Sequence, residues 1–256
     1  MSVLSYLQKR SADAVLSASE KSSIATSIST LRSRMDSYFG DDVSNHFTFG
    51  SYTRDTILPR SMDAQSDIDY MVVFSAAGSK PQTYLDRLKR FVEAKYQTSE
   101  LYQSNPTIVL ELNHIKFELV PALSNWPSGY NIPNGPNDWQ HTDPNDFNTK
   151  LSNKNAAEGY HLKPAIRLLK FWNADAGYVF DSYGVEKWVV EQWFYGCSNQ
   201  RDYLFSIFDK LVIPTDTQWR KDRVERAKKI VAQVRAYETS QMPATAEAEV
   251  KKLIPE

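Results

Sequence analysis

The sequence predicts an α+β protein with a sheet-containing front lobe and a helical back lobe. Two observations support this division. Compact runs rich in β-branched and aromatic residues occur in the first half, at 69–74, 107–112 and 115–122. From about residue 143 onward, apolar residues recur instead at helical spacing.

The segment 126–146 is rich in Pro, Asn and Gly and has little periodicity. Such composition is typical of a connection, so we interpret this segment as the crossover between the lobes. We expect residues 1–135 to form the front lobe and residues 136–256 to form the helical lobe.

The elements follow in order along the chain. Apolar residues at helical spacing predict one or two helices over 6–39, which end at Gly40. Phe47 to Phe49 alternates into a turn at Gly50 and Ser51, and Pro81 opens a helix through about Tyr96. Further helices are predicted at the positions 165–172, 182–195, 203–211 and 219–237.

The runs 107–112 and 115–122 are separated by only Asn113 and His114. A two-residue connection is of hairpin length. We therefore expect these runs to pair as antiparallel strands of the front-lobe sheet.

Bulk composition excludes several classes of protein. The chain has 256 residues, 41% of them apolar, with 30 basic against 31 acidic residues and a net charge of -1. This balance argues against strong binding to duplex nucleic acid, which needs many phosphate-neutralising cations. No apolar run suits a membrane span and no signal peptide is evident. The single cysteine, Cys197, fits a reducing compartment, so a cytoplasmic protein is expected.

Two carboxylates open the strand at 69–74. Side chains two apart in a strand share a face, so Asp67 and Asp69 project together. Glu118, on the strand 115–122, is a credible third carboxylate, although it could equally be a solvated residue paired with Lys116. Three carboxylates can hold two divalent ions, and oxygen ligands suit Mg²⁺; Mn²⁺ is the alternative metal.

The turn at Gly50 and Ser51 adds a possible phosphate site. Glycine lets backbone amides approach an anion, and Ser51 offers both an amide and a hydroxyl. A small-residue turn next to paired carboxylates is what metal-assisted nucleotidyl transfer requires.

These motifs, together with Phe117 to Ala122 and the later runs 166–173 and 180–186, resemble the polymerase-β-like nucleotidyltransferases. The similarity is greatest to the branch that contains oligoadenylate synthase, cyclic GMP-AMP synthase and the bacterial CD-NTases with a SMODS domain. The resemblance spans roughly residues 45–195. It implies a two-lobed nucleotidyltransferase fold with a mixed sheet, and an active site in the cleft between the lobes.

The resemblance also implies the activity. Among bacterial members this is the Mg²⁺-dependent joining of ATP or other NTPs into a cyclic or linear oligonucleotide second messenger, in antiphage defence, with a downstream effector that binds the product. The residues that match the metal-binding acids are Asp67, Asp69 and Glu118. The residues that match nucleotide-binding positions are Gly50, Ser51, Arg54, Lys170, Ser182 and Tyr183.

Reasoning from the residues alone leaves alternatives open. Lys170 fits a snorkelling surface lysine, Ser182 a helix cap, and Tyr183 a core position. Two features also depart from the family that the chain resembles: the third acid there is commonly Asp, whereas this chain has Glu118, and the chain is short for this branch. The function could also be transfer to an RNA end or a protein, or nucleotide sensing without catalysis.

Overall fold

The computed structural model describes residues 2–104, 106–213 and 217–256. The chain divides into two compact units. One unit comprises residues 16–60 and 64–149 and holds the sheet. The other comprises residues 1–15, 61–63 and 150–256 and is helical. Each unit is described separately below.

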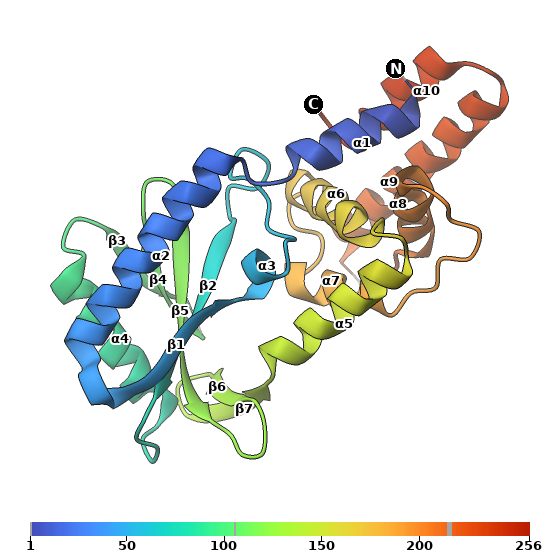
Figure 1. Ribbon diagram of the computed structural model, residues 1–256. Helices are drawn as coiled ribbons and strands as arrows, with labels where there is room; N and C mark the ends of the chain where they lie inside the picture. Colours follow the sequence, from blue (N-terminus) through green and yellow to red (C-terminus); the bar gives the residue numbers. More distant parts are fainter. Residues whose placement is uncertain (1, 105, 214–216) are drawn as a thin grey trace. The chain divides into compact units, whose positions relative to one another are not determined.

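The sheet unit is a mixed sheet with helices on one face (Figure 1). Strand order is β1-β2-β5-β4-β3, with β6 beside β5 and β7 beside β6. Only β2 and β5 pair in parallel; the other described pairs are antiparallel. The strands are β1 Val43–Phe49, β2 Asp67–Phe74, β3 Glu100–Ser104, β4 Thr107–Glu111, β5 Lys116–Ser124, β6 Tyr130–Asn134 and β7 Asp138–Thr142.

Helices α2 (Ala18–Phe39) and α4 (Pro81–Lys95) cover one face of the sheet. Ser17 caps α2 through a capping box with Glu20, and Pro81 stands in the first turn of α4, where its missing N–H costs nothing. The core between helices and sheet includes Tyr70, Phe91 and Phe117, all fully buried. Because Tyr70 packs in this core, its side of β2 faces the helices and the other side of β2 faces away from them.

The opposite face of the sheet has a smaller apolar cluster. Met71, Val73 and Ala122 are buried there and pack with aromatic residues of β1 and β6. Along β2 these residues alternate with the helix-facing ones, so Asp67 and Asp69 lie on the face opposite to α2 and α4.

The helical unit gathers helices from both ends of the chain. The Tyr6 hydroxyl donates to the Ile254 carbonyl at 2.7 Å, and the Ser11 hydroxyl donates to Gln200 Oε1 at 3.1 Å. The helices are α1 Val3–Asp13, α6 Leu162–Asp175, α7 Ser182–Val190, α8 Gln200–Lys210, α9 Gln218–Thr239 and α10 Pro243–Val250. Helix α5 (Pro144–Ala157) runs from one unit into the other, and two short turns, η1 (Gly40–Asp42) and α3 (Gly50–Thr53), belong to the sheet unit.

The hairpin of β4 and β5 is confirmed, but the predicted lobe boundary at 135/136 is wrong. Residues 130–142 form the β6–β7 hairpin rather than a crossover, and β6 pairs with β5, which holds them in the sheet unit. The N-terminal helix joins the helical unit because its buried face packs on α6, α8 and α10. Helix α7 ends at Val190 rather than 195, and β3 and α10 were not predicted.

Among the described residues, no helix is both long and apolar enough to cross a membrane.

Candidate active site

Three carboxylates lie together on one face of the sheet. In the parallel pairing of β2 with β5, Asp69 is opposite Glu118 and Asp67 is opposite Lys116. The alternation of each strand turns these side chains to the same face. The Asp67 and Glu118 side chains are 26% and 25% exposed, so ligands can reach them from solvent. The predicted grouping of these residues is confirmed.

Lys116 lies within the same cluster. Its Nζ is 3.4 Å from Asp67 Oδ2 and 3.6 Å from Glu118 Oε1, and its side chain is 13% exposed. Burial alone would lower the pKa of Lys116, but the charges of Asp67 and Glu118 outweigh it and raise the pKa above its ordinary value. The sequence indicated the pairing with Glu118 and missed the contact with Asp67.

The carboxylates strongly affect the protonation of Asp67. Burial, then the charges of Asp69 and Glu118, raise the pKa of Asp67 to about 8, while Lys116 opposes the shift. A hydrogen bond with Glu118 also favours the protonated form. Asp67 therefore carries a proton through much of the neutral range, because burial and the charges of Asp69 and Glu118 all disfavour its ionised form.

The turn after β1 packs directly against Asp69. Gly50 has φ +73°, and a Cβ on it would lie 1.7 Å from Asp69 Oδ2. Only glycine lets the backbone come this close to the carboxylate. The Ser51 carbonyl accepts from the amides of Thr56 and Ile57 at 3.0 and 3.1 Å, which closes the loop after the turn. The predicted juxtaposition of Gly50 with the carboxylates is confirmed, and phosphate binding by Ser51 stays a prediction.

Arg54 is buried just after this turn. Its side chain is only 6% exposed, and its guanidinium carbon lies 5.2 Å from the ring centroid of Phe147. This cation–π packing and burial hold the end of the 50–54 segment in place. They account for Arg54 without a ligand, so nucleotide binding by Arg54 also stays a prediction.

Lys170 is a buried residue of the helical unit. Its Nζ lies 2.9 Å from Glu186 Oε1, and the two side chains are 6% and 1% exposed. Helices α6 and α7 bring the pair together. The alternative of a snorkelling surface lysine is therefore wrong. Glu186 was not predicted, and no signal in the sequence alone points to this pairing.

Ser182 and Tyr183 open α7 in the same unit. The helix is capped by Asp181, whose carboxylate accepts from the Gly184 amide at 2.5 Å, so Ser182 is not the cap. Tyr183 is 45% exposed rather than part of the core, and Lys187 Nζ lies 5.5 Å from its ring centroid. Lys170, Ser182 and Tyr183 belong to a different unit from the carboxylates, so one site shared by the two lobes stays a prediction.

The donor set suits a divalent cation chemically. Carboxylate oxygens are the ligands that Mg²⁺ and Mn²⁺ favour. The charges of Asp69 and Glu118, which contribute to the raised pKa of Asp67, would also attract a cation. Within the described residues no group of three His, Cys, Asp or Glu is already arranged around a metal position.

Comparison with known proteins decides the family. The model of the Second Messenger Oligonucleotide or Dinucleotide Synthetase (SMODS) domain matches residues 1–155. This chain belongs to the SMODS family. A probable cyclic nucleotide synthase of Bacillus cereus (strain VD146) is 25% identical over 182 residues, which are 56% of this chain and 54% of that protein. The SMODS chain thus spans about half the length of this curated relative.

Solved structures share the fold of this SMODS protein. E. coli MS115-1 CdnC, solved with HORMA-deltaN, has a TM-score of 0.72 at 16% identity, with 98% of this chain and 96% of that one covered. Bradyrhizobium diazoefficiens CdnG, solved with GTP, has a TM-score of 0.72 at 10% identity, with 97% of each chain covered. Vibrio cholerae DncV, solved in its apo form, has a TM-score of 0.64 at 15% identity, with 99% and 80% covered. The predicted nucleotidyltransferase fold is confirmed.

Proposed function

We propose that this chain is a metal-dependent nucleotidyltransferase that joins NTPs into a cyclic or linear oligonucleotide second messenger, with release of pyrophosphate, in bacterial antiphage signalling. The observation that carries the proposal is the cluster of Asp67, Asp69 and Glu118 on one sheet face, with Gly50 packed against Asp69. Membership of the SMODS family supports NTPs as substrates, as do the solved structures of the similar proteins CdnG with GTP and CdnC with ATP.

In the proposed reaction, a ribose hydroxyl of one nucleotide attacks the α-phosphorus of another, and the bond to the pyrophosphate oxygen breaks. Mg²⁺ held by Asp67, Asp69 and Glu118 would lower the pKa of the attacking hydroxyl and neutralise charge on the triphosphate. The backbone of Gly50 and Ser51 would bind phosphate oxygens next to these acids. Lys170 would add a positive charge from the helical unit, and Tyr183 would stack on a base.

The carboxylate cluster also bears on the alternatives. A protein that only senses nucleotides has little need for three mutually repelling carboxylates on one sheet face. The observation therefore favours catalysis. The net charge of -1 favours small nucleotides over a large RNA as the acceptor.

The test is product formation from all four α-labelled NTPs with Mg²⁺ or Mn²⁺, read by chromatography and mass spectrometry. We expect an oligonucleotide product that falls by at least about 100-fold in the double variant Asp67→Ala and Asp69→Ala, since the metal site is removed. Asp138→Ala, which removes an exposed carboxylate of β7 in the same unit, is the matched control and should leave the product unchanged.

Two further arms separate the alternatives. Label that enters added tRNA or protein, with no free oligonucleotide, would assign a macromolecular acceptor instead. Calorimetric binding of NTPs without metal dependence and without any product would assign a sensor. Either result overturns the proposal.

A further inference from the structure

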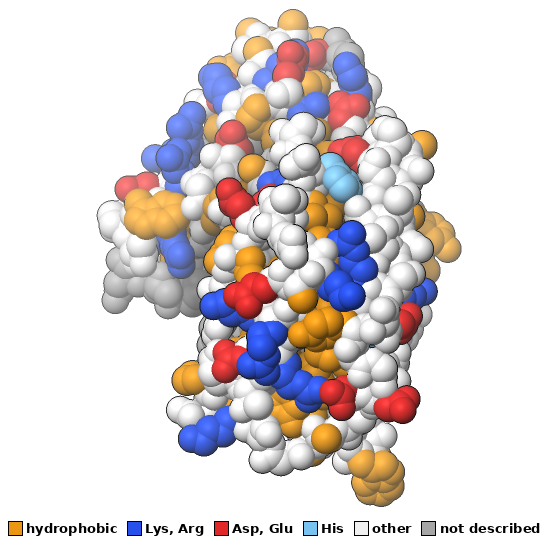
Figure 2. All heavy atoms as spheres, turned by 90° about the vertical axis from the view of Figure 1, so that its left-hand side faces the viewer, with side chains coloured by type: hydrophobic (Ala, Val, Ile, Leu, Met, Phe, Trp, Pro, Cys, Tyr) orange, Lys and Arg blue, Asp and Glu red, His pale blue; other side chains and the backbone are white. Residues whose placement is uncertain are grey.

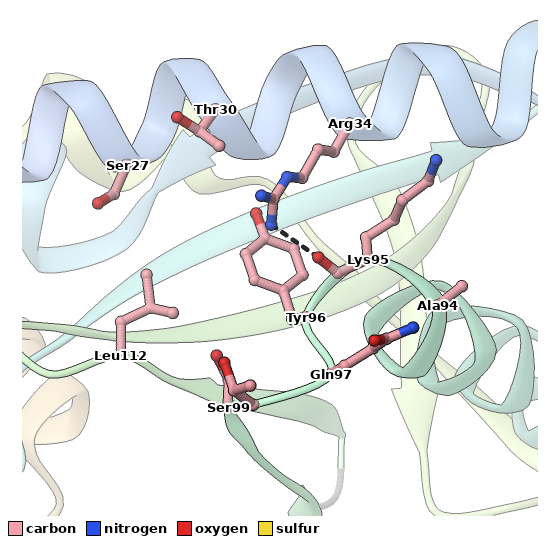
Figure 3. A pocket seen from close by; sticks show the side chains of 10 residues that line it. Ser27, Thr30, Arg34, Ala94, Lys95, Tyr96, Gln97, Ser99 and Leu112 are labelled. Carbon is pink, nitrogen blue, oxygen red and sulfur yellow. Dashed lines mark hydrogen bonds between the residues drawn. The ribbon is translucent and has the colours of Figure 1, made fainter.

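A pocket of about 430 Å³ opens on the face of the sheet unit that α2 and α4 cover. Ser27, Thr30 and Arg34 line it from α2, Lys95 and Tyr96 from the end of α4, and Leu112 from the end of β4 (Figure 3). We call it the α2–α4 pocket. Its volume lies within the range of small-molecule sites. Because the carboxylates project from the other face of the sheet, this pocket is separate from the candidate active site.

The charges that line the α2–α4 pocket have one sign. Arg34 and Lys95 are its charged residues, and neither an Asp nor a Glu is among the described residues that line it. In the described part of the chain, neither cation is paired with a carboxylate. A second hollow of about 390 Å³ adjoins along α2 and shares both cations. In Figure 2, which faces this side of the sheet unit, Lys and Arg side chains lie among uncharged surface and some Asp and Glu side chains. Charge complementarity therefore favours an anion.

Arg34 is held ready for such a group. Its Nη1 donates to the Lys95 carbonyl at 2.7 Å, and its guanidinium carbon lies 4.3 Å from the ring centroid of Tyr96. Figure 3 shows the guanidinium between α2 and the end of α4, over the tyrosine. These contacts use only some of the five N–H donors of the Arg34 guanidinium and leave others for a ligand. A side chain already ordered loses less entropy on binding.

The hydroxyls along α2 define the rest of the ligand. Thr30 Oγ1 donates to the Thr26 carbonyl at 3.0 Å, and the Ser33 hydroxyl donates to the Ser29 carbonyl at 3.1 Å. With their hydrogens used within the helix, these oxygens are acceptors. They suit O–H or N–H groups of a ligand whose anionic end lies at Arg34 and Lys95.

We propose that the α2–α4 pocket binds a small, hydroxyl-bearing organic anion whose phosphate or carboxylate is held by Arg34 and Lys95. The site is independent of the proposed nucleotidyl transfer, and its existence requires no catalysis.

The test uses the full chain without divalent metal and three probes: ribose 5-phosphate, gluconate and uncharged ribose. Binding is located by hydrogen-exchange mass spectrometry, which separates the pocket from the active site. We expect ribose 5-phosphate, gluconate or both to slow exchange in residues 94–99, and ribose to have no effect. Protection by only one of the two anions identifies phosphate or carboxylate as the group bound, and supports the site in either case.

Two variants then test whether Arg34 and Lys95 bind the anion. Arg34→Met keeps a side chain against Tyr96 and should weaken binding by about tenfold, since a charge-assisted hydrogen bond is lost. Lys95→Met leaves the carbonyl bond to Arg34 intact and should weaken binding several-fold, so it decides the question if Arg34→Met fails to fold. Lys21→Met removes an exposed charge from the same helix and should change nothing.

The proposal is overturned if neither anion protects residues 94–99 at about 10 mM. It is also overturned if protection is confined to the Gly50–Thr53 turn, or if Lys21→Met weakens binding as much as the two pocket variants do.

Discussion

Gly50 and Asp69 pack so closely that no side chain fits between them: a Cβ at position 50 would lie 1.7 Å from Asp69 Oδ2. The turn that follows β1 and the second carboxylate of β2 therefore form one structural unit. Residues 49 and 69 are also Cα partners in the β1–β2 ladder, which places the turn at the end of this pairing. Any change at Gly50 is transmitted directly to the Asp69 carboxylate.

Gly50→Ala should lower the free energy of unfolding by about 2 kcal/mol or more and abolish product formation. The substitution adds backbone strain at φ +73° and drives a methyl group into the Asp69 carboxylate. Denaturant unfolding and the NTP assay measure the two effects. Gly135→Ala is the matched control, because Gly135 has φ +84° in the same unit but open space around it. Equal activity of the two variants would refute a role for the Gly50–Asp69 contact.

Lys116→Met should increase the stabilisation that Mg²⁺ confers. The ammonium lies 3.4 Å from Asp67 and 3.6 Å from Glu118, so its removal leaves the carboxylates with more unbalanced charge and a stronger attraction for a divalent cation. Without metal the variant should lose about 1 kcal/mol of stability at neutral pH. Thermal unfolding with and without Mg²⁺ measures both. A Mg²⁺ shift equal to that of the wild type would show that Lys116 does not compete with metal.

The metal-free protein should lose stability as pH rises from about 4 to about 8. The pKa of Asp67 is raised from 3.8 to about 8 on folding, so the folded state binds more protons than the unfolded state between these values. Its contribution to the free energy of unfolding falls across this window. Folding also raises the pKa of Lys116, but this changes the free energy of unfolding only above about pH 10.5, the ordinary pKa of the residue. It therefore does not affect the window set by Asp67.

Denaturant unfolding in EDTA, measured at several pH values, tests this. Asp67→Asn removes the titrating group and should flatten the pH dependence relative to the wild type, while Asp138→Asn should not. If the Asp67→Asn curve runs parallel to the wild-type curve, Asp67 is not the group responsible.

The sequence predicted those features that depend on local periodicity. Alternation along β2 placed Asp67 and Asp69 on one face, and the short link at Asn113 indicated the β4–β5 hairpin. The contact of Lys116 with Asp67 could not be predicted in this way, because it depends on the parallel register of β2 with β5, which is set by the fold. The spacing of Lys116 and Glu118, two residues apart on one strand, did indicate that these two side chains share a face.

The wrong lobe boundary has two different causes. The β6–β7 hairpin carried a signal that was outweighed by its prolines: Asn134 and Gly135 stand at the turn, and Gly135 has the positive φ that such turns need. No local sequence pattern indicates that α1 belongs to the helical unit. This membership depends on contacts such as that of Tyr6 with Ile254, which joins the two ends of the chain.

The buried pair of Lys170 and Glu186 allows stability and function to be separated. Glu186→Leu alone should destabilise the protein by about 3–5 kcal/mol, because it leaves the Lys170 charge buried without its partner. The double variant Lys170→Met with Glu186→Leu replaces both charges by apolar groups and should recover most of that stability. If Lys170 contacts the triphosphate, the double variant should remain impaired despite its recovered fold, with a raised KM for NTPs. Denaturant unfolding and steady-state kinetics on the same preparations measure this, and wild-type kinetics in the stable double variant would limit Lys170 to a structural role.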